Sequence, residues 1–287
     1  MRPVTEKIIE RFFFLSAFIS GLITCSIFVF LLIPGLPLFW GGRFFSILTD
    51  PWAPGLGQFG IYPMITGTLA ITLLTMLFAF PLSLGCATLM STESNSRLSW
   101  LLRKTVEMMT GIPTVIYGFV GIFLLVSLVR NTFVSGGSGM CVLSAALMLT
   151  LLVSPTMILL FCDSFSRVPH SYGDAVLALG GTEVQKFLYV TLPNSWPGIL
   201  AGFTLAFGRV LGDTLIALMI AGNAVQVPGS LFDSVRTLTS HIALVFAADY
   251  NSPEFQAIFA CAIFLYFFSS ILAIAVRLIH DRRRIMS

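Results

Sequence analysis

Two charged side chains stand in an otherwise apolar stretch, Gly208-Arg209-Val210-Leu211-Gly212-Asp213-Thr214. Placing one such residue in a membrane helix costs roughly 2.5–3.5 kcal/mol of insertion free energy, and charged residues inside a membrane usually have a function. In a continuous helix, Arg209 and Asp213 share one face and can form an ion pair. The stretch is therefore a candidate site for charged cargo.

The planar donors of a guanidinium suit phosphate-like oxygens, so Arg209 can offer a passing anion a transient counter-charge. Asp213 would hold that guanidinium in place and keep the anion from binding too tightly, because a transport site must also release its ligand. The alternative is structural: a buried ion pair or a polar lock between helices.

A second pattern lies in the connection at 163–198. It runs Asp174-Ala175-Val176, three residues, Gly180, nine residues, Val190, one residue and Leu192-Pro193. It predicts a short helix over 172–179, broken by Gly180-Gly181. A second helix is capped by Thr182 with Gln185 and ended by Pro193 and Pro197. Such a compact knob suits a partner that pushes or pulls it, whereas an amphipathic surface loop is the alternative.

Two further charged residues are secondary candidates. Glu107 lies one turn from Arg103 and Lys104, so a surface ion pair is its simplest role. Arg236, in an expected outer loop, is a candidate to receive an anion or a docked protein. An ordinary solvated arginine is the equally weighted alternative at that position.

We find no pattern of catalytic or metal-ligating residues. The histidines are scattered and the five cysteines contain no CxxC pair, so neither a metal site nor a disulfide framework is expected. The sequence GxxxxGK[ST] is absent, so ATP hydrolysis would need a separate protein. The cationic residues are spread along the chain, which argues against nucleic-acid binding.

Composition indicates an all-α membrane protein. Hydrophobic residues make up 56% of the 287 positions and charged residues 10%, against about 25% charged in soluble domains. A spanning helix needs roughly 20 mostly apolar residues. Six segments qualify: about 12–34, 62–90, 107–130, 140–162, 199–222 and 256–279.

The positions of lysine and arginine predict the orientation. Basic residues gather in the N-terminal tail, after the second and fourth spans and at the C-terminal end, whereas the alternate loops hold only Arg43, Arg130 and Arg236. Cytoplasmic loops are the basic ones. Both termini are therefore expected to be cytoplasmic, with the N-terminal span retained. The segment 223–255 is too polar to span, although 235–247 can form a short surface or re-entrant helix.

The connection at 163–198 resembles the "EAA" loop of ABC-importer permeases, EAA-x3-G-x9-I-x-LP, with Asp174 and Val176 as departures. The segment 209–214 resembles the "RA[IL]GET" of phosphate-uptake (Pst) permeases, with Asp213 for Glu. Gly111-Ile112-Pro113-Thr114-Val115-Ile116-Tyr117-Gly118 is similar to their "GIPSVVYG". The resemblance runs from about residue 44 to the end and looks nearer the C-type than the A-type subunit.

That resemblance implies a single 1–287 permease domain of the type I ABC importer (MetI-like) fold in a bacterial cytoplasmic membrane, importing inorganic phosphate. It implies a homologous permease partner, two ATPase subunits that use ATP and Mg, and an extracytoplasmic phosphate-binding protein. The chain itself would bind no cofactor. The substrate pathway would include Arg209, Asp213 and Thr214. The ATPase would dock on the loop carrying Asp174, Ala175, Gly180, Leu192 and Pro193.

Other interpretations stay open. Permeases for sulfate, molybdate or phosphonate share the coupling loop. Only the segments 209–214 and 111–118 favour phosphate. A membrane-embedded enzyme would need several polar groups at one depth, and only Arg209 and Asp213 qualify. A sensory role is compatible with transport.

Overall fold

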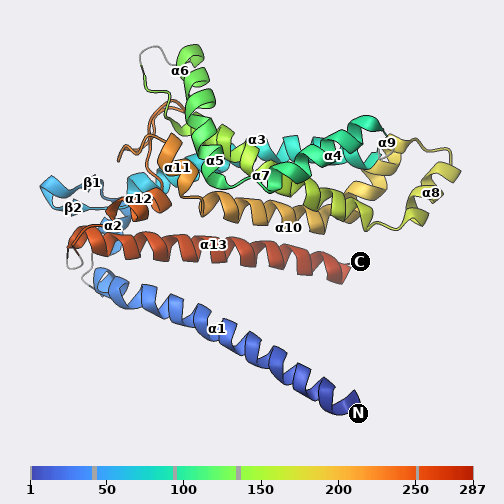
Figure 1. The fold of residues 1–287 in the computed structure, drawn as a ribbon, viewed down its shortest axis with the longest axis horizontal. Helices are drawn as coiled ribbons and strands as arrows, with labels where there is room; N and C mark the ends of the chain where they lie inside the picture. Colours follow the sequence, from blue (N-terminus) through green and yellow to red (C-terminus); the bar gives the residue numbers. More distant parts are fainter. Residues whose placement is uncertain (1, 41–43, 93–95, 134–136, 250–251, 287) are drawn as a thin grey trace.

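The computed structural model describes residues 2–40, 44–92, 96–133, 137–249 and 252–286, nearly all of them helical (Figure 1). The long helices are α1 (Arg2–Trp40), α3 (Tyr62–Thr92), α7 (Val142–Ser166), α10 (Leu192–Leu211) and α13 (Pro253–Met286). The shorter ones are α2 (Phe44–Thr49), α4 (Arg97–Thr110), α5 (Thr114–Val120), α6 (Ser127–Phe133), α8 (His170–Ala178), α9 (Glu183–Lys186), α11 (Leu215–Ile220) and α12 (Leu238–Val245). A small antiparallel hairpin pairs β1 (Trp52–Ala53) with β2 (Gln58–Phe59).

Five helices among the described residues are long and apolar enough to cross a membrane: Glu6–Gly35, Tyr62–Thr92, Thr114–Phe133, Val142–Ser166 and Pro253–Val276. They correspond to the first, second, third, fourth and sixth predicted spans. The all-α membrane architecture expected from composition is therefore confirmed. Arg43, used above for orientation, lies outside the described residues.

The fifth predicted span, 199–222, is wrong as a continuous helix. The chain forms α10 to Leu211, interrupts at Gly212–Thr214, and resumes as the short α11. A backbone N–H in the first turn of α11, that of Ile216, donates to the Asp213 carboxylate instead of extending α10. Hydropathy does not register this interruption because apolar residues continue on both sides of it.

The third predicted span, 107–130, begins too early. The helix α4 ends at Thr110, and α5 starts at Thr114 after a break at Gly111-Ile112-Pro113. Proline lacks an N–H and disfavours helical geometry in the residue before it, so Pro113 separates the two helices. Glu107 consequently belongs to α4. A wide π-helical turn, Gly121–Val126, then joins α5 to α6.

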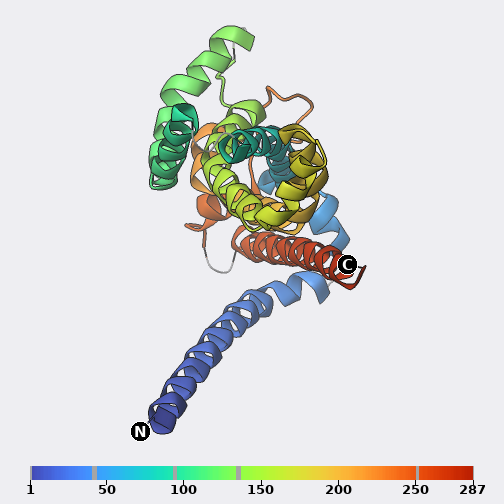
Figure 2. The ribbon, with the colours of Figure 1, turned by 90° about the vertical axis from the view of Figure 1, so that its right-hand side faces the viewer.

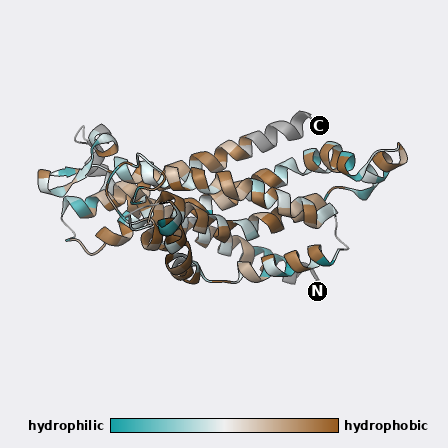
Figure 3. Cartoon of the chain, turned by 90° about the horizontal axis from the view of Figure 1, so that it is seen from above, coloured by the Kyte–Doolittle hydropathy of each residue, from teal (hydrophilic) through white to brown (hydrophobic). Residues whose placement is uncertain are grey.

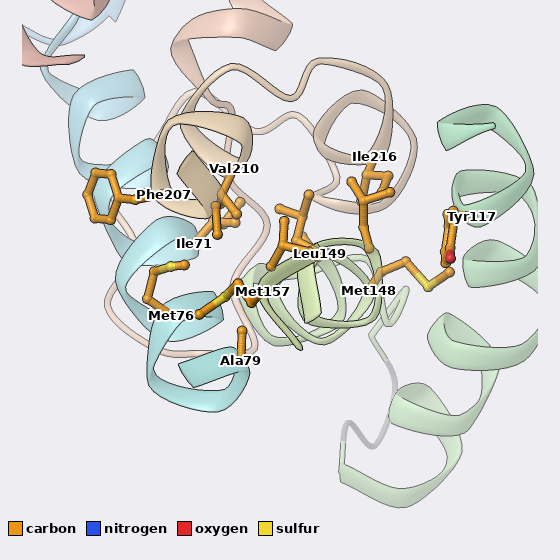
Figure 4. Close-up of a cluster of buried hydrophobic side chains, with 14 of the residues drawn as sticks. Ile71, Met76, Ala79, Tyr117, Met148, Leu149, Met157, Phe207, Val210 and Ile216 are labelled. Carbon is orange, nitrogen blue, oxygen red and sulfur yellow. The ribbon is translucent and has the colours of Figure 1, made fainter. Parts of the chain in front are cut away.

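The helix α7 forms the centre of the bundle. Its side chain Met157 points toward α3, Leu149 toward Ile216 of α11, and Met148 toward Tyr117 of α5 (Figure 4). Polar links cross the same contact, since Thr150 Oγ1 on α7 donates to the Thr75 carbonyl on α3 at 3.3 Å. Close packing against α10 depends on Gly202, where a Cβ would lie 2.9 Å from the ring of Phe161. The core thus fixes α3, α7 and α10 relative to one another.

The helix α1 leaves this bundle and touches mainly α13 (Figure 2). Phe28 packs on Tyr266 with ring centroids 4.7 Å apart, and Gly35 lies against Ile263. Apolar residues predominate along the long helices of the bundle (Figure 3). Most described side chains of α1 are exposed and apolar, a surface that requires lipid or another chain as its solvent. The start of α1 and the end of α13 lie at the end of the molecule that carries α8 and α9 (Figure 1).

Candidate functional site

The side chain of Arg209 opens on a groove of about 890 Å³ between α7, α10 and α13. Small or apolar residues form most of its wall: Val153, Thr156, Pro197, Ala201, Thr204, Leu205, Ala206, Gly208, Ser269, Leu272, Ala273 and Val276. Arg209 is exposed in the isolated chain, in the last turn of α10. Within a membrane, a charge of this kind faces either a water-filled path or another protein surface, not lipid.

A neutral hydroxyl holds this guanidinium. Arg209 Nη1 donates to Thr156 Oγ1 on α7 at 3.1 Å. Among the described residues, Arg209 has no carboxylate within ion-pair distance. The side chain is therefore oriented by a hydrogen bond to an uncharged group rather than by an ion pair. Such an arrangement can receive an anion without first displacing a resident carboxylate.

The predicted ion pair between Arg209 and Asp213 is wrong. Asp213 Oδ1 instead accepts a hydrogen bond from the Ile216 backbone N–H at 2.9 Å, the interaction of a helix-capping aspartate. The four-residue rule assumes one continuous helix, and the break at Gly212–Thr214 removes that premise. Thr214 stands at the start of α11, half-buried, and Asp213 shapes the break rather than neutralising Arg209.

Outside this break, a polar cluster connects α12 to the same segment. Thr239 Oγ1 donates to the Asp213 carbonyl at 2.8 Å. Arg236 Nε donates to the Asn223 carbonyl at 3.1 Å, and Arg236 Nη1 lies 3.5 Å from His241 Nδ1. Arg236 is half-buried, so it is not the solvated loop residue of the alternative interpretation. Burial lowers the pKa of its guanidinium.

His241 was not singled out from the sequence because an isolated histidine carries no pattern. Its side chain is fully buried and packs edge-on against Trp52, with ring centroids 4.3 Å apart. Burial first, and the charge of Arg236 second, lower its pKa to about 4, so the imidazole is neutral at pH 7. Asn223 was also missed. It holds a positive φ of 60° at the end of α11 and donates to the Leu218 carbonyl at 2.6 Å.

The predicted knob is present, and we define it as residues 170–186. The helix α8 ends before Gly180, whose φ of 82° suits glycine. Thr182 and Gln185 form the predicted capping box, with bonds of 2.8 and 3.3 Å. Asp174, Ala175 and Gly180 are all exposed. Leu179 beside them is 89% exposed, which is typical of a surface that another protein covers.

The prediction that Pro193 and Pro197 end the second short helix is wrong. The chain continues from α9 through a wide π-helical turn, Phe187–Thr191, directly into α10. Pro193 falls in the first turn of α10, where a missing N–H costs little. The knob is therefore joined to the helix bearing Arg209 by uninterrupted helical backbone. Leu192 packs against the core, whereas Pro193 is exposed.

Glu107 pairs as expected with Lys104 at 2.9 Å and Arg103 at 3.3 Å. The hydrogen bond from Lys104 is the main reason that its pKa is lowered. These side chains are exposed on α4 and do not line the groove at Arg209. The surface-pair interpretation of Glu107 is therefore confirmed.

Comparisons with known proteins show the family and the fold of this chain. The family model "Binding-protein-dependent transport system inner membrane component" matches residues 79–285. The probable ABC transporter permease protein YqgH of Bacillus subtilis is 30% identical over 229 residues, 79% of this chain and 74% of the relative. The phosphate transport system permease protein PstC of Mesorhizobium japonicum is 28% identical over 251 residues, 80% and 77% of the two chains. YqgI of Bacillus subtilis, also named a probable ABC transporter permease protein, is 29% identical over 222 residues, 77% and 72% of the two chains.

Solved structures show the same fold. A chain of the bacterial alginate ABC transporter superposes with a TM-score of 0.67 at 15% identity, covering 97% of each chain. A chain of the inward-facing MetNI methionine ABC transporter gives a TM-score of 0.62 at 19% identity, covering 77% of this chain and 96% of that one.

Proposed function

Because this chain belongs to the family of binding-protein-dependent transport system inner membrane components, we propose that the cargo of this multi-pass ABC importer permease is inorganic phosphate. The permease is a non-catalytic transport subunit. The observation that carries the proposal is Arg209, whose guanidinium donates to the Thr156 hydroxyl and has no carboxylate within ion-pair distance among the described residues. Only the Nη1 atom of Arg209 has a hydrogen bond among the described residues, so its other donors are available to oxyanion oxygens.

Phosphate, rather than another oxyanion, is supported by the relatives named PstC. Sulfate, molybdate and phosphonate are the alternative cargoes, since an arginine attracts all of them. Thr214 and the Asp213 carboxylate follow Arg209 at the helix break, and Arg236 donates to the Asn223 carbonyl after α11. We assign these three residues to the outer part of the transport path and Arg209 to its central anion-binding site.

The open groove supports a paired permease. Arg209 is exposed on an apolar wall, and a homologous subunit facing that wall would enclose a path around the guanidinium. YqgH and YqgI of Bacillus subtilis both match this chain, which supports a heterodimer. Two ATPase subunits, using ATP and Mg, would dock on the exposed knob at Asp174, Ala175 and Gly180. An extracytoplasmic phosphate-binding protein would deliver the cargo, and both termini would be cytoplasmic.

The test is uptake of labelled phosphate into vesicles that contain the assembled transporter, with unlabelled phosphate, sulfate or molybdate as competitor. Only unlabelled phosphate should reduce uptake substantially at equal concentration. Stronger competition by sulfate or molybdate would assign the other oxyanion as cargo. Absence of any ATP-dependent anion uptake would refute the proposed role of Arg209.

A further inference from the structure

A second cavity, of about 460 Å³, lies at the base of the knob and shares no lining residue with the groove at Arg209. It is bounded by the ends of α3 and α7, by α4, by the first turn of α8 and by the turn entering α10. The polar side chains in its wall are Ser91, Ser99, Arg103, Ser166, His170, Lys186 and Thr191. No aspartate or glutamate is among the residues that line it.

The charge of this wall is positive. Arg103 and Lys186 each have a carboxylate partner, Glu107 at 3.3 Å and Glu183 at 3.2 Å, but both carboxylates lie outside the lining. Those pairs are half-exposed, and exposed ion pairs of this kind contribute little. Neither cation is therefore committed to its partner, and both can turn toward a stronger anion in the cavity.

The position of Lys186 depends on a glycine. Gly173 on α8 is buried, and a Cβ there would lie 2.6 Å from Lys186 Cε and 3.2 Å from Cδ. The aliphatic stem of Lys186 thus lies across the bare backbone of α8. Both residues also line the cavity, so this contact fixes where the ammonium group reaches the wall.

From this wall we infer a binding site for a phosphate group, distinct from the transport path, at the joint between the bundle and the knob. A guanidinium and an ammonium from different helices suit the oxygens of a phosphate group. The Ser99 and Ser166 hydroxyls in the same wall already donate to the Met90 and Asp163 carbonyls. The volume also admits a phosphate ester. The group can therefore be free phosphate or the headgroup of an anionic lipid, and in either case it would connect α4 to α8.

Binding of labelled inorganic phosphate should be measured by equilibrium dialysis on the assembled transporter in phosphatidylcholine nanodiscs. Every variant carries Arg209→Ala, which removes the proposed anion-binding residue of the transport path. Phosphate bound in that path therefore does not contribute to the measurement, and the result does not depend on whether the proposed function is correct. Lys186→Gln and Arg103→Gln should each weaken binding roughly tenfold or more, the effect of losing one charge-assisted hydrogen bond. Gly173→Ala should weaken it by displacing Lys186.

Arg167→Gln is the matched control, because Arg167 is a cation at the same end, paired with Asp163 at 2.7 Å, and does not line the cavity. A parallel arm purifies each variant from nanodiscs containing phosphatidylglycerol and counts retained lipid by native mass spectrometry. Phosphate binding lost in Lys186→Gln but kept in Arg167→Gln assigns a free anion. Retained phosphatidylglycerol lost in the same selective way assigns a headgroup. If neither is bound, or if Arg167→Gln acts like Lys186→Gln, the site does not exist.

Discussion

Arg209 on α10 donates its hydrogen bond to Thr156 on α7, not to Asp213 on its own segment. The guanidinium is thereby positioned by a group that carries no charge. The sequence pattern predicts that Asp213 orients Arg209. In the structure Thr156 orients the arginine, and Asp213 instead caps α11.

Thr156→Val should lower phosphate uptake severalfold, because the isosteric change removes the hydroxyl that orients Arg209 and leaves the groove's volume unchanged. Uptake rates at saturating and limiting phosphate provide the measurement. The control is Thr204→Val, which alters the same groove but removes a hydroxyl bonded to the Leu200 carbonyl. Equal losses in both variants would mean that the Arg209–Thr156 bond has no special role.

Asp213→Asn should retain most transport and stability, because asparagine caps a helix about as well as aspartate. Asp213→Ala should destabilise the α10–α11 junction by about 1 kcal/mol, the usual cost of removing a cap. Thermal denaturation and uptake are to be compared for the two variants. Should Asp213→Asn be as damaging as Asp213→Ala, the negative charge itself would be required and the capping role would be insufficient.

Gly180→Ala should reduce coupling between ATP hydrolysis and transport. A residue with a Cβ at a φ of 82° costs about 1–2 kcal/mol, so the angle between α8 and α9 would change. The ratio of phosphate imported to ATP hydrolysed by the assembled complex should fall. Gly85→Ala is a suitable control, since Gly85 lies inside α3 with nothing within 4 Å of an added Cβ. An unchanged ratio in Gly180→Ala would exclude the knob as the coupling element.

His241 should make stability depend on pH. Its folded-state pKa of about 4 lies below the ordinary value of 6.5, so the unfolded chain binds the extra proton. The neutral imidazole therefore contributes stability that is complete above pH 6.5 and is lost as the pH falls toward 4. His241→Gln should flatten the fall in Tm between pH 7.5 and pH 5, because glutamine does not titrate. The same slope in both proteins would assign the pH effect to other groups.

Local chemistry was enough to predict much of the knob and five of the spans. Long apolar runs have no alternative to helix in a membrane, so composition alone located them. The capping box at Thr182 and the left-handed turn at Gly180 are decided by residues within a few positions of each other. The same locality explains the pairing of Glu107 with Lys104, one helical turn away.

Contacts between distant segments decided the rest. The break at Gly212–Thr214 lies between two apolar segments, and Thr239, 26 residues after Asp213, donates to the Asp213 carbonyl there. Thr156 lies 53 residues before Arg209 and becomes its partner only because α7 packs beside α10. The sequence by itself predicted a charge within an apolar stretch and a knob between two spans. Only the tertiary structure decided that Arg209 meets Thr156 and, in the part of the chain that the structure describes, forms no ion pair with a carboxylate, because helix packing and helix breaks set which side chains meet.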